Sequence, residues 1–381
     1  MSDSIYLDNN ATTPVAPECL DAMLACLREN HGNPSSKHRA GERAKQSVNE
    51  ARAQVAGLLK AMPAEIVFTS GGTESNHLAI LGALALNPDK RHVITSTVEH
   101  PSTLSLLKHL ETMGVRVTVL PVDAQGQLDL AVLSRALTPD TALVTLLWAN
   151  NETGVLFPIE AAAKIVKSAG VLFHTDAVQA VGKIAIDLKQ LPVDFLSLSG
   201  HKLHAPKGVG ALFVRKGVKP PPLLFGHQER ARRGGTENVP GIVGLGVAAA
   251  LAREAMEADT ARMRALRECL EQGVVERIPF ARVNGVGAAR VANTSNIRFG
   301  DMEAEIILDR LDRAGICAAL GAACTAGGSE PSHVLTAMGL DRRAARASVR
   351  FSLSRYTTNA EIERVLEVLP SIVHEAVTRA A

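Results

Sequence analysis

The sequence predicts an α/β protein with a large domain, built on a mostly parallel sheet flanked by helices, and a smaller α+β domain. Short apolar, β-branched runs alternate with helix-length periodic segments over the first 214 residues, as in a parallel sheet covered on both faces. After residue 214 the pattern changes to an irregular connection and then to a mixture of helices and strands. The composition is globular, with 46% hydrophobic and 21% charged residues.

Seven segments of the first part have the composition of buried strands. They are residues 65–69, 92–96, 115–120, 142–148, 171–175, 195–198 and 210–214. Helical periodicity occurs in most of the gaps, over residues 74–86, 102–113, 128–137 and 159–169. Strands and helices in this order predict parallel strands joined by crossover helices.

The second part follows Pro220-Pro221-Pro222 and Gly234-Gly235, which mark a long irregular connection. We expect a helix over residues 239–258 and another that ends near residue 275. The later elements are a strand at 296–299, a helix at 303–314, a short strand near 316, a glycine-rich loop at 321–328, a strand at 349–353 and a helix from 359. We therefore assign residues 14–256 to the large domain, and 1–13 with 257–381 to the small one.

Composition argues against several classes of partner. Lys and Arg number 41 and Asp and Glu 39, so the net charge of +2 favours neither nucleic acid nor a membrane surface. Aromatic residues are only 3%, too few for a base-stacking platform. The N-terminus has no basic start or apolar run, and the most apolar stretch, 241–252, is shorter than the ~20 residues of a membrane span. We interpret this stretch as a buried helix.

The five cysteines predict a reducing, cytoplasmic location, because their number is odd and no Cys-x-x-Cys pair occurs. Cys324 lies among small residues in the 321–328 loop, which favours an accessible thiol, so it is the candidate nucleophile. The other four, Cys19, Cys26, Cys269 and Cys317, lie in apolar periodic segments and are interpreted as core or helix-surface residues.

Polar clusters follow five predicted strands, each at the carboxyl end. They are residues 70–74, 99–100, 150–152, 176–179 and 199–202. Any one of them could be a turn. Because ligands bind outside the carboxyl ends of the strands in open α/β sheets, the five together predict one crevice.

The residue types in these clusters predict a pyridoxal 5′-phosphate site. Gly71-Gly72-Thr73 opens a helix and suits one phosphate, although a capped helix start would also explain it; the P-loop pattern for a nucleoside triphosphate is missing. Lys202 could form a Schiff base, and Asp176 could hold the proton of a pyridinium nitrogen. Three further side chains could contact the ring: His100 by stacking, and Asn151 and Gln179 by hydrogen bonds. Singly, these residues could be a surface lysine, a turn aspartate and a core histidine.

Arg350 lies within a predicted strand of the small domain. A buried arginine suits bidentate capture of an amino-acid carboxylate, and the alternative is an internal ion pair with an acidic residue of the protein.

These motifs resemble the cysteine desulfurases of the aminotransferase class V group, fold-type I pyridoxal-phosphate enzymes, and most closely their nitrogen-fixation type. The likeness runs from YLDNNATTP at 6–14 to VRFSLSRYTT at 349–358. Its most specific parts are FHTDAVQ at 173–179, LSGHK at 198–202, RGGTEN at 233–238 and EPSHVL at 330–335, and WANNETG at 148–154 and LHAPKG at 203–208 point to the nitrogen-fixation type.

The resemblance implies a role for each matching position. Lys202 would carry the cofactor, Asp176 would pair with its ring nitrogen, Gln179 with its ring oxygen, and His100 would stack on the ring and help proton transfer. The phosphate would be bound by Gly72, Thr73, Ser199 and His201, and by Thr236 of the neighbouring subunit in a homodimer. Asn151 would contact the cofactor or the substrate carboxylate. Arg350 would hold the carboxylate of L-cysteine, and Cys324 would take its sulfur.

The implied activity converts L-cysteine to L-alanine, with the sulfur held as a persulfide and passed to an iron–sulfur scaffold protein. The persulfide of Cys324 would also ligate, transiently, the metal of the scaffold's growing cluster. Whether the acceptor serves nitrogenase or general iron–sulfur assembly stays open. The family's usual Ser-Gly-Ser-Ala-Cys is here Leu320-Gly321-Ala322-Ala323-Cys324, so two hydroxyl donors are missing. The alternatives are another class V activity, such as an aminotransferase or selenocysteine lyase, and a non-enzymatic sulfur or metal carrier.

Overall fold

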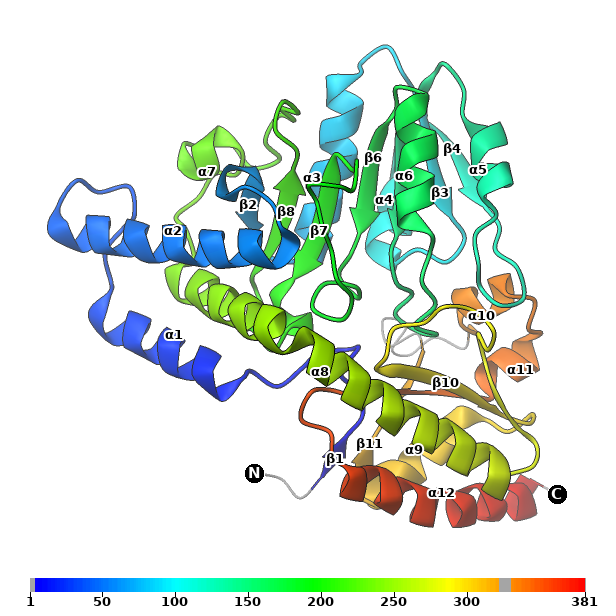
Figure 1. The fold of residues 1–381 in the computed structure, drawn as a ribbon. Coiled ribbons are helices and arrows are strands. Elements are labelled where there is room, and N and C mark those ends of the chain that lie inside the picture. Colours follow the sequence, from blue (N-terminus) through cyan, green and yellow to red (C-terminus); the bar gives the residue numbers. More distant parts are fainter. Residues whose placement is uncertain (1–3, 322–329, 381) are drawn as a thin grey trace.

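The computed structural model describes residues 4–321 and 330–380, and its larger part is built on a seven-stranded sheet (Figure 1). The strand order is β2-β8-β7-β6-β5-β3-β4. The strands are β2 (Ile66–Thr69), β3 (His92–Ser96), β4 (Arg116–Leu120), β5 (Thr141–Leu147), β6 (Leu172–Asp176), β7 (Phe195–Ser199) and β8 (Gly210–Val214). All seven predicted strands are confirmed.

Strands β3 to β7 pair in parallel, whereas β8 is antiparallel to both of its neighbours, β7 and β2. The connection from β7 to β8 contains only the short helix η2 (Gly200–Lys202) and a loop. It is too short for the crossover that a parallel strand needs, so the chain reverses. The sheet is therefore mostly parallel, as the sequence predicts.

Helices cover both faces of this sheet. Helices α3 (Gly72–Leu86) and α4 (Pro101–Thr112) pack on one face in one hydrophobic cluster. The other face carries α2 (Arg39–Leu59), α5 (Leu130–Ala136), α6 (Ile159–Ser168) and the first half of α8 (Val239–Arg277). The sequence assigned no helix to α2 or to α1 (Pro17–Glu29), which packs on α8. Short helices η1 (Pro63–Glu65) and α7 (Gln228–Ala231) complete this part.

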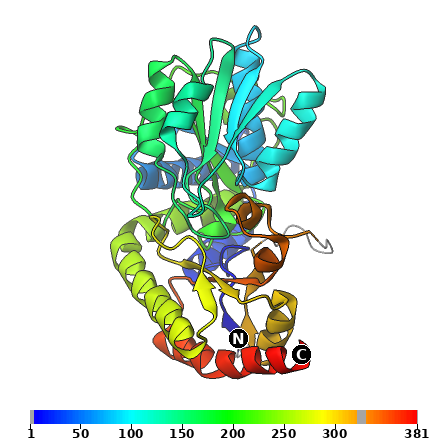
Figure 2. The same cartoon turned by 90° about the vertical axis from the view of Figure 1, so that its right-hand side faces the viewer.

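A second sheet, β12-β13-β10-β9, lies below the first in Figures 1 and 2 with its own hydrophobic cluster. Its strands are β9 (Ala281–Val283), β10 (Thr294–Phe299), β12 (Ala319–Leu320) and β13 (Ser348–Ser352). Beside it, β1 (Ile5–Tyr6) pairs in parallel with β11 (Ile316–Cys317). The remaining helices are α9 (Ala304–Arg313), α10 (His333–Ala337), α11 (Arg342–Arg346) and α12 (Asn359–Ala380).

Helix α8 is one continuous helix of 39 residues, so the predicted break between two helices near residue 258 is wrong. Its first half packs closely on α2: a Cβ at Gly246 would lie 2.6 Å from Cα of Ala51. Among the described residues, α8 is the one helix long and apolar enough to pass a composition test for a membrane span, and half of its most apolar window is buried in the protein. The proposed domain boundary at residue 256 falls inside α8.

Candidate active site

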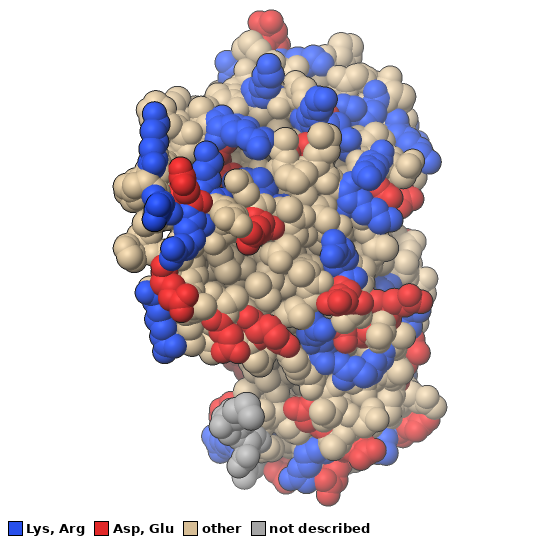
Figure 3. Space-filling view, turned by 60° about the vertical axis from the view of Figure 1, so that its left-hand side comes forward, with Lys and Arg blue, Asp and Glu red and all other residues tan. Residues whose placement is uncertain are grey.

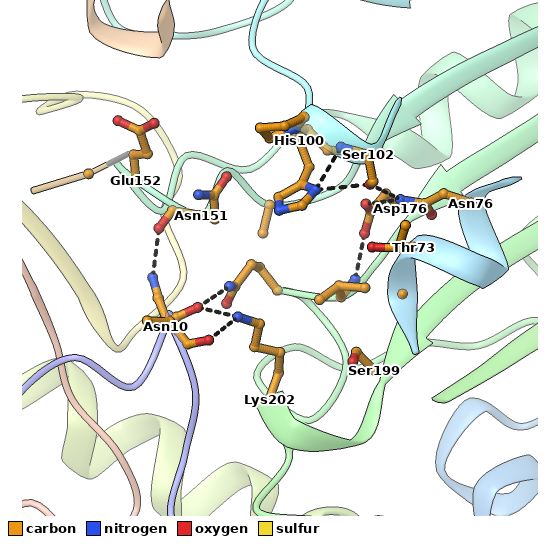
Figure 4. Close-up of a pocket in the computed structure, with 18 of the residues that line it drawn as sticks. Asn10, Thr73, Asn76, His100, Ser102, Asn151, Glu152, Asp176, Ser199 and Lys202 are labelled. Carbon is orange, nitrogen blue, oxygen red and sulfur yellow. Dashed lines mark hydrogen bonds between the residues drawn. The ribbon is translucent and has the colours of Figure 1, made fainter. Parts of the chain in front are cut away.

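A cavity of about 260 Å³ lies at the carboxyl ends of the parallel strands (Figure 4). It brings together ten of the predicted site residues: Gly72, Thr73, His100, Asn151, Asp176, Gln179, Ser199, His201, Lys202 and Arg350. In Figure 4, Thr73 and Ser199 lie toward one end of the cavity, and Asn151 and Glu152 lie toward the other. The five polar clusters thus converge on one site.

The Thr73 end is built to receive an anion. Helix α3 begins there, and its N-cap Gly71 has no side chain to bind the first N–H groups of the helix. A Cβ at Gly72 would lie 2.8 Å from Cγ2 of Val178, so only glycine lets the backbone approach this closely. A more open hollow adjoins the cavity here and adds Lys207 to its lining.

His201 lines both hollows in its neutral form. Burial lowers its pKa to about 4, and the positive charges of Lys202 and Lys207 act in the same direction. A neutral imidazole can donate one hydrogen bond to an anion without adding a charge.

Asp176, at the end of β6, is fixed by two donors. Its Oδ2 accepts from Nδ2 of Asn76 at 2.7 Å, and its Oδ1 accepts from the backbone N–H of Val178 at 3.0 Å. Asn76 lies one turn after Thr73 on α3, so one helix provides both the anion-binding end and the partner of the carboxylate.

His100 is the N-cap of α4 and also lines the cavity. Its Nδ1 accepts from the backbone N–H of Ser102 at 3.1 Å and lies 2.9 Å from Oγ of the same residue. The neutral ring therefore carries its proton on Nε2. Burial lowers the pKa of His100, Lys202 acts in the same direction, and Asp176 opposes the shift.

The Lys202 ammonium is held at the cavity wall by two carbonyl oxygens of the N-terminal segment. Its Nζ lies 2.5 Å from the oxygen of Asn10 and 2.7 Å from that of Ala11. Gln179 donates its Nε2 to the same Asn10 oxygen at 3.0 Å. Asn10 belongs to the motif at 6–14 that carries the family likeness, but the sequence did not predict that this segment forms part of the site.

Arg350, in the middle of β13, is fully buried at the Asn151 end. Its Nη2 lies 2.7 Å from Oδ1 of Asp8, and its Nη1 donates to the oxygens of Asn151 and Gly321. The alternative of an internal ion pair is thus realised. Its Nε has no hydrogen-bond partner among the described residues. Since an unsatisfied buried donor is costly, this guanidinium still suits an added carboxylate.

Two further acidic and basic side chains line this end and were not predicted as site residues. Glu152 is buried, and its Oε2 accepts from Oγ of Ser332 at 2.5 Å; burial raises its pKa. His333 donates its Nε2 to the backbone oxygen of Glu99 at 3.0 Å. Glu152 belongs to the polar cluster 150–152 that predicted the crevice but was given no role of its own, and His333 lies in the EPSHVL motif of the resemblance.

Two predicted residues remain, Cys324 and Thr236. Cys324, with its expected roles as nucleophile and transient metal ligand, lies outside the described residues. Thr236 lines a separate hollow with Arg233 and Glu229. Among the residues that the structure describes, no group of three His, Cys, Asp or Glu side chains could hold a metal ion.

The cavity fits pyridoxal phosphate. It offers an anion site at a helix N-terminus, a carboxylate for a ring nitrogen, an amide, an imidazole and an amine. The orphaned Nε of Arg350 adds a donor for a substrate carboxylate.

Comparison with known proteins gives a consistent result. The model of the aminotransferase class-V family matches residues 5–365. Cysteine desulfurase 2 of Trichormus variabilis is 56% identical over 370 residues, 97% of this chain and 93% of the relative. Cysteine desulfurase NifS of Azotobacter vinelandii is 52% identical over 371 residues, covering 97% and 92%. A solved NifS-like protein superposes with a TM-score of 0.91 at 38% identity, covering 98% of this chain and all of the other.

Proposed function

The chain belongs to the aminotransferase class-V family and is a cysteine desulfurase, and we propose that its cavity binds pyridoxal 5′-phosphate and turns L-cysteine into L-alanine and protein-bound sulfur. One observation carries the proposal: Lys202, Asp176 and the Thr73 anion site line the same cavity as Arg350. An amine, a ring-nitrogen partner, a phosphate site and a carboxylate site are the four groups that such chemistry on an amino acid requires.

Within the cavity, Lys202 would bind the cofactor covalently, and Gly72, Thr73, Ser199 and His201 would hold its phosphate. Asp176 would keep the ring nitrogen protonated, fixed by Asn76. When bound, the cofactor supplies the electron sink that stabilises negative charge on the carbons of the substrate.

The chain's own residues position the substrate and move protons and sulfur. Arg350 and Asn151 would bind the carboxylate of L-cysteine, and the Lys202 amine would take the Cα proton, with His100 assisting through its Nε2. The Cys324 thiolate would attack the substrate sulfur. The new S–S bond forms as the C–S bond breaks, and the carbon keeps the electron pair and takes up a proton. The products are the Cys324 persulfide and L-alanine.

Because the product is a persulfide, the proposed sulfur acceptor is an iron–sulfur scaffold protein in the cytoplasm. Where that scaffold serves nitrogenase, the sulfur would be used to build the clusters of nitrogenase. An aminotransferase would use the same cofactor residues but no thiol, so activity that survives Cys324→Ala would favour that alternative. A non-enzymatic carrier would not need Lys202.

A homodimer is part of the proposal, with Thr236 reaching the phosphate of the neighbouring site. It is supported by exposed apolar side chains: Leu20, Leu24 and Leu27 on α1, and Leu223, Leu224 and Phe225 before α7, with Phe225 85% exposed. On the side of the molecule that includes α1, α2 and α7, Figure 3 shows charges of both signs around an uncharged central area. A second copy of the chain would bury these apolar residues.

The test is an absorbance spectrum of the purified holoprotein before and after L-cysteine, with alanine and sulfide measured under reductant. We expect a visible band that changes, and alanine and sulfide in equal amounts. Lys202→Ala should abolish the band and both products, whereas Lys167→Ala, on α6, should keep them. A band with alanine but no sulfide would contradict desulfuration and leave the cofactor assignment standing.

A further inference from the structure

Lys183 is a buried lysine that the reaction above does not use. It follows Gln179 by four residues, and only 9% of it is exposed. Its Nζ lies 2.6 Å from Oε1 of Gln179 and 3.3 Å from Oδ1 of Asn10. Burying an ammonium is costly, and both of these partner atoms are neutral amide oxygens.

The chemistry of an ammonium decides which way the Gln179 amide points. A side-chain amide has an oxygen that accepts and a nitrogen that donates, and the surrounding hydrogen bonds decide between its two orientations. The charged form of Lys183 can only donate, and its Nζ lies 2.6 Å from Oε1 of Gln179, so it holds that oxygen toward itself. The nitrogen then faces the other way, toward the oxygen of Asn10 at 3.0 Å and the cavity that Gln179 lines. Because Nε2 carries two hydrogens, one remains for a group in the cavity.

Asn10 makes this arrangement rigid. Its Oδ1 accepts from Lys183 and from Nδ2 of Asn293, and its Nδ2 donates to Oγ1 of Thr294 at 2.8 Å. Its backbone oxygen accepts from both Gln179 and Lys202 (Figure 4). One asparagine therefore sets the positions of both lysines relative to the amide.

We propose that Lys183 is a positioning residue of this site: by holding Oε1 of Gln179, it presents the Gln179 amide as a hydrogen-bond donor to the ring oxygen of the cofactor. The inference rests on the proposed function, in which Gln179 contacts that oxygen. A neutral apolar residue at position 183 would remove one of the two hydrogen bonds that orient the amide and leave only the one from Nε2 to the oxygen of Asn10.

The surroundings of Lys183 disfavour its charged form. Burial lowers its pKa to about 7, and the positive charges of Lys202 and Arg350 act in the same direction. On its other side, Lys183 lines a small hollow with His204 and Asp259, and Asp259 is the one carboxylate in that lining. A lysine that only filled space would be better replaced by an apolar side chain.

The test is a double-mutant cycle on the dissociation constant of pyridoxal phosphate, measured on the full chain after removal and return of the cofactor. Lys183→Met should weaken binding roughly tenfold, the value of one hydrogen bond to an anionic acceptor. Gln179→Ala should weaken it similarly. In the Gln179→Ala background, Lys183→Met should change the constant by less than about twofold, because its effect passes through Gln179.

A spectroscopic readout separates positioning from a structural role. An N–H donor stabilises the negative charge on the ring oxygen, so its loss should move the absorbance transition of the bound cofactor to higher pH in Lys183→Met. Lys167→Met, which removes a half-buried lysine paired with Asp194, should lower the thermal midpoint without moving that transition. Lys183→Met should not lower the midpoint, since it removes a buried charge.

Lys183→Gln keeps an N–H donor without the charge and should retain the affinity of the original protein to within about threefold. Binding that Lys183→Met leaves unchanged, or weakens equally in the Gln179→Ala background, would overturn the inference; so would Lys183→Gln behaving like Lys183→Met. If Gln179→Ala binds the cofactor normally, the role of Gln179 in the proposed function fails as well.

Discussion

Several side chains that line the cavity are oriented by a neighbour with the opposite hydrogen-bonding character. Ser102 fixes the tautomer of His100 through its backbone N–H, and Asn76 fixes the carboxylate of Asp176. The site is therefore organised before a ligand enters, and little ordering cost remains for binding.

At Arg350 we predict that Arg350→Lys raises the KM for L-cysteine roughly thirtyfold, because a lysine keeps the charge but loses the planar, two-pronged donor set. Steady-state kinetics would measure this. Arg298→Lys is the matched control, since Arg298 lies on the adjacent strand β10 and pairs with Asp301 at the surface. An unchanged KM in Arg350→Lys would show that Arg350 serves only its ion pair with Asp8.

At Glu99 we predict that replacing the carboxyl by an amide stabilises the protein, and that this gain grows with pH. Burial raises the pKa of this carboxyl to about 8, although Ser96 and the N–H of Leu147 donate to it. Between the ordinary carboxyl pKa and about 8, the folded state binds a proton that the unfolded state does not, so the contribution of Glu99 to stability falls as the pH rises.

Glu99→Gln removes this loss. The free energy of unfolding of Glu99→Gln relative to the original protein should rise by about 1.4 kcal/mol per pH unit between pH 5 and 8. Urea unfolding at several pH values would measure it. Glu330→Gln, at an exposed glutamate paired with Arg342, should show no such trend. A constant difference for Glu99→Gln would refute the prediction.

The sequence predicted the groups of the site better than the partners that hold them. Lys202 and Asp176 were found because they follow strands, where parallel sheets bind ligands. Asn76 and Ser102 were missed because an asparagine or serine in the first turns of a helix is ordinary. Only the packing of α3 against β6 shows that Asn76 meets Asp176.

At the scale of elements, the buried strands were the most predictable, because parallel strands covered on both faces are continuous apolar runs. Helices α1 and α2 carry many charged residues among their apolar ones and were not assigned. The continuity of α8 was missed as well, because its first half is packed against α2 and its second half against α12, so its apolar face changes along its length.

A buried ion pair joins three elements, and we predict that it is a major element-level contribution to stability. Arg52 on α2 makes two hydrogen bonds to Glu229 of α7, at 2.6 and 2.7 Å, and Glu229 also accepts from the N–H of Phe68 on β2. Glu229→Gln should lower the free energy of unfolding by about 3–5 kcal/mol, because it leaves Arg52 buried without a countercharge.

Asp309→Asn is the control for this prediction. It breaks the exposed pair of Asp309 with Arg313 and should cost about 0–1 kcal/mol. Denaturant unfolding of the two variants would compare them. A cost for Glu229→Gln no greater than that for Asp309→Asn would contradict the prediction.

At the scale of the whole molecule, the site depends on segments far apart in the chain. Asp8 and Asn10 come from the N-terminal segment, Lys202 from η2 after β7, and Arg350 from β13, and β1 is held beside β11. No periodicity in the sequence reports such long-range contacts. The motif at 6–14 indicated only that the segment belongs to the family pattern.

The proposed homodimer gives a prediction at this scale. Phe225→Asp should convert a dimer into a monomer, because it places a charge in the apolar surface that a second copy would cover. Light scattering coupled to gel filtration would measure the mass. Met113→Asp, at another exposed apolar residue beyond α4, should remain dimeric. A monomeric original protein would contradict the dimer.

The most direct test of the central claim is the position of the sulfur after reaction. The holoprotein is treated with L-cysteine without reductant, alkylated and analysed by mass spectrometry of its peptides. We predict one added sulfur atom on the peptide that contains Cys324, absent in Cys324→Ala and kept in Cys269→Ala, where another exposed thiol is removed. Alanine formation with no sulfur on that peptide, or with sulfur on Cys269 instead, would contradict desulfuration through Cys324.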